Sequence, residues 1–197
     1  IYPYEALRAE VTCAYTNVSQ DSDRTVRRVL MKESYAGQEQ TMFPQAIYER
    51  YCEKTGQTIN TIASDKTGRT LINYSGKPGD YECISLVDVL QGKIDTRVFK
   101  DSIVLVGAYA AGMQDNFNVP NGGNQQMYGV EIHANILQAF MQNRFSVNGN
   151  PFLFGLLTGF VCAILHFVFK RTKIWLSAIL LIAGVAANLI AGVILNN

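Results

Sequence analysis

The chain has 197 residues and a formal net charge of +1, from 17 basic and 16 acidic side chains interspersed along its length. This charge pattern excludes a surface for nucleic acid. Residues 1–150 have the size of one domain with its own core, whereas residues 151–195 are almost wholly apolar.

The first third of the chain predicts short helices and strands. The expected elements are a helix over Tyr4–Val11, strands over Ala14–Val18 and Val26–Ser34, and a helix over Phe43–Lys54. The helix is indicated by Phe43, Ile47 and Tyr51, which recur at helical spacing, and by Gly56, which is a typical stop signal.

Charged residues cluster between and within the first two predicted strands. Asp21 and Asp23 could hold a cation weakly, but the EF-hand pattern is missing, so an ordinary polar turn is the preferred interpretation. Arg27 and Arg28 are neighbours on a strand and should face opposite sides. We expect one of them to pair internally and the other to be solvated.

Further elements follow between residues 58 and 142. We expect a hairpin of Thr58–Ala63 with Arg69–Tyr74, a loop over Ser75–Tyr81, a short helix after Ser85, a strand over Ile103–Val106, a loop over Ala108–Tyr128 and a helix over Gly129–Gln142. The apolar run Ile103–Val106 predicts a central strand buried on both faces. In the last helix, Val130, Ala134, Leu137 and Met141 are the expected buried residues. The alternation of strands and helices predicts an α/β domain with a mostly central mixed sheet.

The residues around the predicted central strand are the best candidates for a ligand site. They are Gly107, Gly112, Asp115, Glu131, His133 and Asn135. The two glycines have neither P-loop nor dinucleotide-binding spacing, so a tight turn is preferred over a phosphate cradle. Glu131 and His133 should point in different directions on the helix. We therefore prefer a structural role, in which the buried Glu131 and His133 tie the long loop to the helix, over catalysis. No catalytic residue, metal or cofactor is predicted.

Four cysteines are present, and Cys162 lies in the apolar tail. Cys13, Cys52 and Cys83 permit at most one disulfide and a spare thiol. We expect the cysteines to be mostly buried small hydrophobic side chains.

Two apolar runs end the chain, Pro151–Phe169 and Ile174–Leu195, joined by the basic loop Lys170–Lys173. Each run has about the length that a helix needs to cross roughly 30 Å of hydrocarbon. The positive-inside rule places the loop in the cytoplasm and residues 1–150 outside it. The predicted organisation is an outer domain over 1–143, a linker over 144–150 and a transmembrane helical hairpin.

Small residues in both runs allow close helix packing: Gly155 and Gly159 in the first, Ala183 and Ala187 in the second. A packed intramolecular hairpin and a homodimer both remain open. The predicted partners are membrane lipid, an unidentified small-molecule or protein ligand, and a second copy of the chain through these helices.

Several stretches in a defined order resemble the type-2 CHASE domain, a sensory module of bacterial membrane receptors. They are Tyr15–Val18, Asp23, Val26–Arg28, Ile72–Gly76, Ile84–Leu90, Phe99–Ala108, Asp115 and Gly129–Asn135. The resemblance covers most of residues 5–143. Arg24 departs from it, because the family usually has Gly after the aspartate, and we expect the turn there to be reshaped.

The resemblance implies an extracytoplasmic signal-input region that acts through its transmembrane helices on a cytoplasmic nucleotide cyclase, diguanylate cyclase or kinase. The alternative is an accessory membrane subunit that organises a complex. The chain begins at Ile1 without a signal peptide, so we expect further sequence upstream. Two crossings return the chain to the outside, so a cytoplasmic output requires at least one more span downstream.

Overall fold

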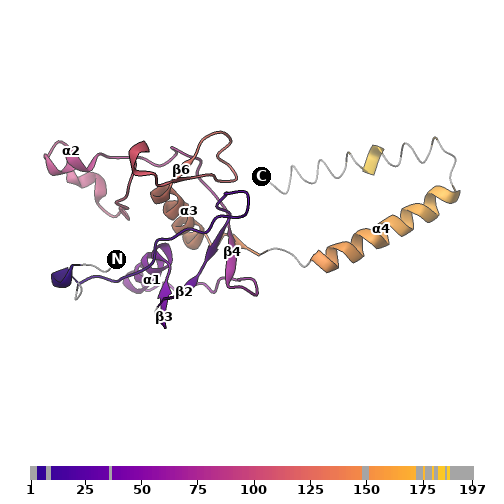
Figure 1. Ribbon diagram of the computed structural model, residues 1–197, viewed down its shortest axis with the longest axis horizontal. Helices are drawn as coiled ribbons and strands as arrows, with labels where there is room; N and C mark the ends of the chain where they lie inside the picture. The colour runs from indigo at the N-terminus through magenta and orange to yellow at the C-terminus, as the bar shows by residue number, and fades with distance from the viewer. Residues whose placement is uncertain are drawn as a thin grey trace. The chain divides into compact units, whose positions relative to one another are not determined.

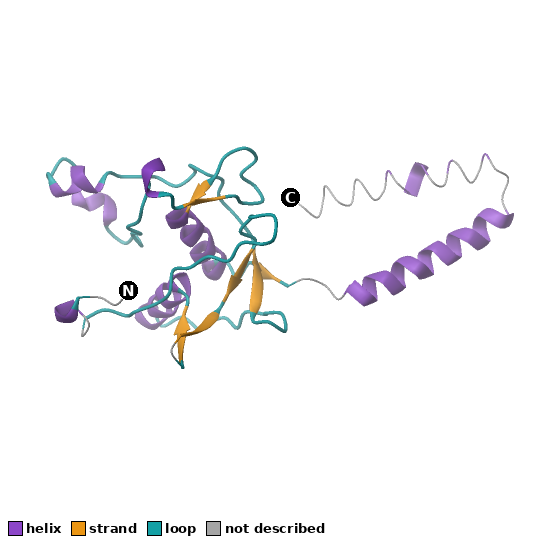
Figure 2. Ribbon diagram, viewed as in Figure 1, coloured by secondary structure: helices purple, strands orange, loops and turns teal. Residues whose placement is uncertain are grey.

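The computed structural model describes residues 4–7, 10–35, 37–147 and 151–171, together with residues 175, 179, 182–184 and 186. The chain divides into two compact units, Ile1–Asn148 and Gly149–Asn197. Figures 1 and 2 show that the first unit mixes helices and strands, whereas the described secondary structure of the second is helical.

The strands of the first unit form three small antiparallel sheets within its described part. β1 (Arg28–Leu30), β4 (Arg69–Ile72) and β7 (Phe145–Ser146) lie in the order β1-β4-β7. β2 (Lys32–Tyr35) forms a hairpin with β3 (Gln38–Thr41), and β5 (Asn116–Phe117) pairs with β6 (Met127–Tyr128). The mixed α/β class is confirmed, but these small sheets replace the single central sheet that the sequence predicts.

Two longer helices of the first unit, α1 (Phe43–Thr55) and α3 (Gly129–Met141), match the predicted helices closely. α1 has Pro44 in its first turn, where the missing N–H is tolerated, and ends at Gly56, whose φ of 70° suits glycine. The shorter helices are α2 (Leu86–Leu90) and the 3₁₀ turns η1 (Glu5–Leu7), η2 (Thr96–Phe99) and η3 (Ala111–Met113).

The core lies where α1 and α3 pack together beside the β1-β4-β7 sheet (Figure 1). Tyr48 of α1 stacks on Phe140 of α3 with ring centroids 5.3 Å apart, and Phe145 of β7 meets Phe140 edge-on at 4.7 Å. Ile132 and Ile136 on α3 are fully buried. The aromatic contacts therefore connect the C-terminal part of α3 to both α1 and the sheet.

α3 is buried on most of its sides rather than along one stripe. Of the four residues expected to be buried, only Leu137 is; Val130 and Ala134 are half-buried and Met141 is 40% exposed. The helix packs against α1, β4 and β6, so more than one face is covered. The buried residues of such a helix cannot be predicted from sequence by finding a single apolar face.

The predicted strand Ile103–Val106 is wrong. These residues have no regular secondary structure, and Val104 and Val106 are 51% and 72% exposed. The physical reason is that no strand in the described part of the chain pairs with this run, and a strand is stable only when its backbone groups are paired.

The predicted hairpin of Thr58–Ala63 with Arg69–Tyr74 is also wrong. Its second half forms β4, but β4 pairs with the distant β1 and β7, and residues 58–63 are irregular. Gly68, in the turn before β4, has a φ of 76°, a left-handed conformation that suits glycine. Earlier in the chain, Val26–Ser34 is divided between β1 and β2, and Ala14–Val18 contributes only an isolated bridge between Tyr15 and Met42.

The second unit contains α4 (Pro151–Arg171), which covers the first apolar run and includes Lys170 and Arg171 of the predicted loop. Within the described part of the chain, no helix has both the length and the apolar character that a membrane crossing requires. The predicted transmembrane hairpin is therefore not supported by the structure. Gly155 and Gly159 are exposed on α4, and Ala183 is helical and exposed. Ala187 and most of the second run lie outside the described residues.

All four cysteines are free thiols. Cys52 is buried in the core, as expected, whereas Cys13, Cys83 and Cys162 are exposed. The expectation that they are mostly buried is therefore wrong.

Candidate functional site

Glu131 is a buried carboxylate that binds two backbone amides near the start of α3. Its Oε1 accepts a hydrogen bond from the Gly79 N–H at 2.8 Å, and its Oε2 accepts one from the Tyr128 N–H at 3.2 Å. The side chain is only 2% exposed. Glu131 therefore caps the N-terminus of α3 and holds the loop Ser75–Tyr81 at the same time, which is a structural role.

Asn135, one turn further along α3, holds the same loop. Its Oδ1 accepts hydrogen bonds from the Ser75 and Gly76 N–H groups at 3.1 and 2.9 Å. Its Nδ2 donates to the Glu131 carbonyl at 3.0 Å, and the side chain is fully buried. Glu131 and Asn135 thus both hold the backbone of residues 75–79, a loop that precedes the long loop Ala108–Tyr128 which Glu131 and His133 were expected to hold.

Gln138 completes the row of loop contacts, because its Oε1 accepts a hydrogen bond from the Tyr81 hydroxyl at 2.8 Å. Residues at positions i, i+4 and i+7 lie along one side of a helix. We call Glu131, Asn135 and Gln138 the loop clamp. It joins α3 to a segment about 50 residues earlier in the chain, as the sequence separations of 52 to 60 residues show.

A pocket of about 620 Å³ lies beside the first turns of α3. Its lining residues come from five separate segments: Thr16, Asn17, Val18, Phe43, Val106, Gly107, Asp115, Phe117, Gly129, Val130 and His133. The volume falls within the usual range for small-molecule sites, and most of the wall is apolar or aromatic with few polar groups.

His133 is the buried imidazole of this pocket. It is 8% exposed, meets Phe43 edge-on at 5.5 Å, and its Nδ1 has no hydrogen-bond partner. Desolvation by burial lowers the pKa of His133 below its usual value, although a hydrogen bond with the Thr16 backbone and the charge of Asp115 act in the opposite direction. The ring is therefore neutral near pH 7.

Asp115 places a carboxylate against the first residue of α3. Its backbone carbonyl accepts a hydrogen bond from the Gly129 N–H at 2.9 Å. A Cβ atom at position 129 would lie 2.5 Å from Asp115 Oδ2, so glycine is required for this approach. Gly107 is similar, because a Cβ there would lie 2.7 Å from the Cβ of Val130. Both glycines allow backbone segments to close the pocket wall.

The structure thus brings together three of the six predicted site residues, Gly107, Asp115 and His133. Glu131 and Asn135 belong to the loop clamp, and Gly112 is exposed in η3 with no atom within 4 Å of a Cβ placed on it. The expected divergence of Glu131 and His133 is confirmed, since they contact different segments. Among the described residues, no three His, Cys, Asp or Glu side chains could share a metal ion.

Sequence reasoning missed Thr16, Asn17, Phe43 and Phe117 as pocket residues. One available signal was the stretch Tyr15–Val18, which carries part of the family resemblance. Phe43 and Phe117 carry no such signal, because an aromatic residue in a core and one in a pocket wall look alike in sequence.

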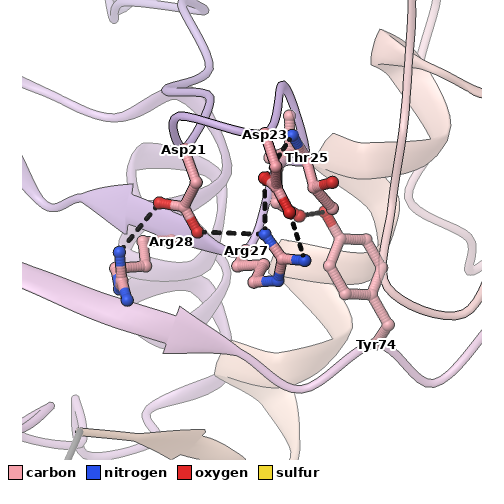
Figure 3. A network of polar contacts seen from close by, with 7 residues as sticks. Asp21, Asp23, Thr25, Arg27, Arg28 and Tyr74 are labelled. Carbon is pink, nitrogen blue, oxygen red and sulfur yellow. Dashed lines mark hydrogen bonds and ion pairs between the residues drawn. The ribbon is translucent and has the colours of Figure 1, made fainter.

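A second polar cluster joins the turn before β1 to that strand (Figure 3). Arg27 contacts both oxygens of Asp23, through Nη1 at 2.8 Å and Nη2 at 2.7 Å, and reaches Asp21 at 3.3 Å. Arg28 also pairs with Asp21, at 2.8 Å. The prediction that one arginine is solvated is therefore wrong, because the turn folds both carboxylates back over the strand.

The turn itself supports the non-metal interpretation of the two aspartates. Asp23 accepts a hydrogen bond from the Thr25 N–H at 3.1 Å, and the pKa of Asp23 is lowered mainly by its bond to Arg27. Arg24 has a φ of 62°, a left-handed conformation that favours glycine. Glycine adopts this conformation more readily than a residue with a Cβ, so Arg24 has a cost in free energy at this position.

The first unit is thus a small α/β domain whose pocket contains Asp115 and His133 among mostly apolar surface. A comparison with models of protein families matches the CHASE2 domain over residues 5–183, and the chain belongs to this family. CHASE2 domains are sensory, extracytoplasmic regions of membrane receptors. Comparisons with curated proteins and with solved structures returned no match.

Proposed function

We propose that this chain is the signal-receiving part of a bacterial membrane receptor, and that the pocket beside α3 is its input site. The observation that carries the proposal is the position of α3. Its first turn forms the pocket wall through Gly129, Val130 and His133, and its C-terminal end precedes the apolar part of the sequence. Membership of a sensory family supports the same interpretation.

α3 is suited to transmit a change because it is firmly held along its length. The loop clamp binds one side, and Phe140 contacts Tyr48 and Phe145 at the other end. The chain then continues through β7, which belongs to the sheet although the sequence places it in the linker. A ligand that favours one of two positions of α3 would bias the segments that follow, because coupling requires different affinities for the two states.

The membrane part of the proposal rests on the sequence. The two apolar runs and the basic residues between them favour a hairpin with residues 1–150 outside, and the second run lies mostly outside the described residues. α4 also exposes large apolar side chains, with Leu156 at 57%, Phe160 at 67% and Phe167 at 70%. Such a surface favours a lipid or protein environment. Gly155 and Gly159 favour pairing of two copies through this helix.

In this proposal the output is a cytoplasmic nucleotide cyclase, diguanylate cyclase or kinase. The test uses the full-length receptor and Thr16→Trp, which places a bulky ring at an exposed position of the pocket wall. We expect the output activity to change. A run of glycines inserted after Val147 should cancel this change, whereas the same insertion after Gly92, in an exposed turn, should not. If Thr16→Trp leaves the output unchanged, the accessory-subunit alternative is favoured.

Orientation in the membrane can be tested separately with single-cysteine variants and a maleimide that cannot cross membranes. Cys83 is exposed on the outer domain, and Lys170→Cys places a thiol at the predicted cytoplasmic loop. We expect Cys83 to be labelled in spheroplasts and the residue 170 thiol to be labelled only after permeabilisation. The reverse pattern would exclude the proposed orientation.

A further inference from the structure

The pocket beside α3 contains a half-buried carboxylate, that of Asp115, and a buried imidazole, that of His133. Within the described part of the chain, no hydrogen bond or ion pair reaches the carboxylate oxygens of Asp115, and the Nδ1 of His133 also has no hydrogen-bond partner. The His133 Nδ1 is closed to solvent, whereas the Asp115 carboxylate can accept a hydrogen bond from a donor outside the protein.

The described lining of the pocket contains an acidic side chain and no Lys or Arg to balance its charge. Asp115 and His133 are the titratable side chains among its described lining residues. The guanidinium groups of Arg27 and Arg28, which are outside the lining, pair with Asp21 and Asp23. The N-terminal dipole of α3 compensates the Asp115 charge only in part, because this effect is typically about 0.3–1 kcal/mol.

The Asp115 carboxylate accepts hydrogen bonds and has no donor in the described structure, so the missing group is a donor. An anionic ligand would meet the Asp115 charge without any cation to offset it. A metal ion would find too few ligands in the described residues.

The remaining walls are suited to an apolar body and to a cation. Phe43 and Phe117 supply aromatic rings, and Val18, Val106 and Val130 supply aliphatic surface. Aromatic faces attract ammonium groups, and this attraction adds to the pairing of an ammonium group with a carboxylate.

We propose that the pocket binds a small organic cation, an alkyl or arylalkyl primary amine whose ammonium group pairs with Asp115 and whose body lies against Phe43 and Phe117. This inference names the ligand class of the proposed input site and rests on that proposal.

The test measures binding to the full chain by isothermal titration calorimetry with 2-phenylethylamine and n-butylamine. Two isosteres of the first amine serve as controls: neutral 2-phenylethanol and anionic phenylacetate. We expect 2-phenylethylamine to bind at least tenfold more tightly than the alcohol, and phenylacetate to show no binding. Equal binding of the alcohol, tighter binding of phenylacetate, or no binding of either amine at millimolar concentration would overturn the proposal.

Two variants locate the site. Asp115→Asn removes the charge and should weaken 2-phenylethylamine binding at least tenfold, with the exposed Asp101→Asn as the matched control. Val106→Lys places an ammonium group at a 72%-exposed position of the pocket wall, so it should compete with the ligand without disturbing the fold. Val104→Lys lies in the same segment but outside the pocket lining, so this variant should bind 2-phenylethylamine as tightly as the wild type does. Unchanged binding in Val106→Lys would refute the location even if Asp115→Asn fails to fold.

Failure of this inference is distinguishable from failure of the proposed function. If no amine binds but Thr16→Trp still changes the output of the full receptor, the pocket remains an input site and the ligand class is wrong. If amines bind with the expected selectivity but Thr16→Trp leaves the output unchanged, the ligand class is right and the signalling role is wrong.

Discussion

Replacement of Asn135 by alanine tests the loop clamp most directly. The Asn135 side chain is fully buried, and its Oδ1 accepts hydrogen bonds from both Ser75 and Gly76. Asn135→Ala leaves these two backbone N–H groups without an acceptor and opens a small cavity in the core beside Met127, which lies 3.4 Å from Nδ2.

The cost follows from these contacts. An unsatisfied buried donor costs about 1–3 kcal/mol. Ser75 is exposed and can bind water instead, whereas Gly76 is half-buried, so the two donors together should cost about 2 kcal/mol. The cavity adds about 1 kcal/mol. We therefore expect Asn135→Ala to lower the free energy of unfolding by about 3 kcal/mol.

The assay is urea denaturation followed by linear extrapolation, with Asn73→Ala as control because Asn73 is exposed and makes no hydrogen bond in the described structure. Hydrogen exchange should become faster at the Ser75 and Gly76 amides and change less at Gly79, which Glu131 holds. A loss below about 1 kcal/mol, or unchanged exchange at both amides, would refute the reasoning.

Three further changes test other features. Arg24→Gly should raise the free energy of unfolding by about 1 kcal/mol in thermal denaturation, because the φ of 62° strains any residue with a Cβ; a lower melting temperature would contradict this. Burial lowers the folded-state pKa of His133, so its stabilising contribution is fully present above its unfolded pKa of 6.5 and is lost as the pH falls through the folded value. Between pH 7.5 and pH 5 the wild type should therefore lose more stability than His133→Gln, and parallel pH profiles would argue against a buried neutral ring. Gly129→Ala should destabilise by about 1–3 kcal/mol, because the new methyl group would lie 2.5 Å from Asp115 Oδ2, and the added Asp115→Ser change should restore part of the loss. Additive losses in the double variant would show that this contact is not the cause.

The helices of this protein could be predicted from sequence, whereas most strand pairings could not. α1 and α3 are indicated by apolar spacing and by Gly56, because helix hydrogen bonds join residues four apart. The run Ile103–Val106 has the composition of a buried strand but no partner strand among the described residues. The composition of a segment shows that it could form a strand, but whether a strand forms depends on a pairing partner that comes from a distant segment.

The candidate site shows the same division. Gly107, Asp115 and His133 could be selected because chemistry-bearing residue types gather near one predicted turn. On α3, helical geometry predicts that His133 points away from Glu131 and Asn135. The residues of the opposite pocket wall cannot be predicted in this way. Thr16, Asn17 and Phe43 reach the pocket only because the N-terminal segment bridges to the start of α1, between Tyr15 and Met42.

By itself the sequence determined the family, the positions of the two main helices and the apolar character of residues 151–195, since each depends on local pattern. Only the tertiary structure decided which polar side chains have hydrogen-bond partners. It buried Glu131 and Asn135 against the backbone of Ser75–Gly79, and it left the Asp115 carboxylate and the His133 Nδ1 without a hydrogen-bond partner beside the pocket. The physical reason is that satisfaction of a polar group depends on partners that folding brings from far along the chain.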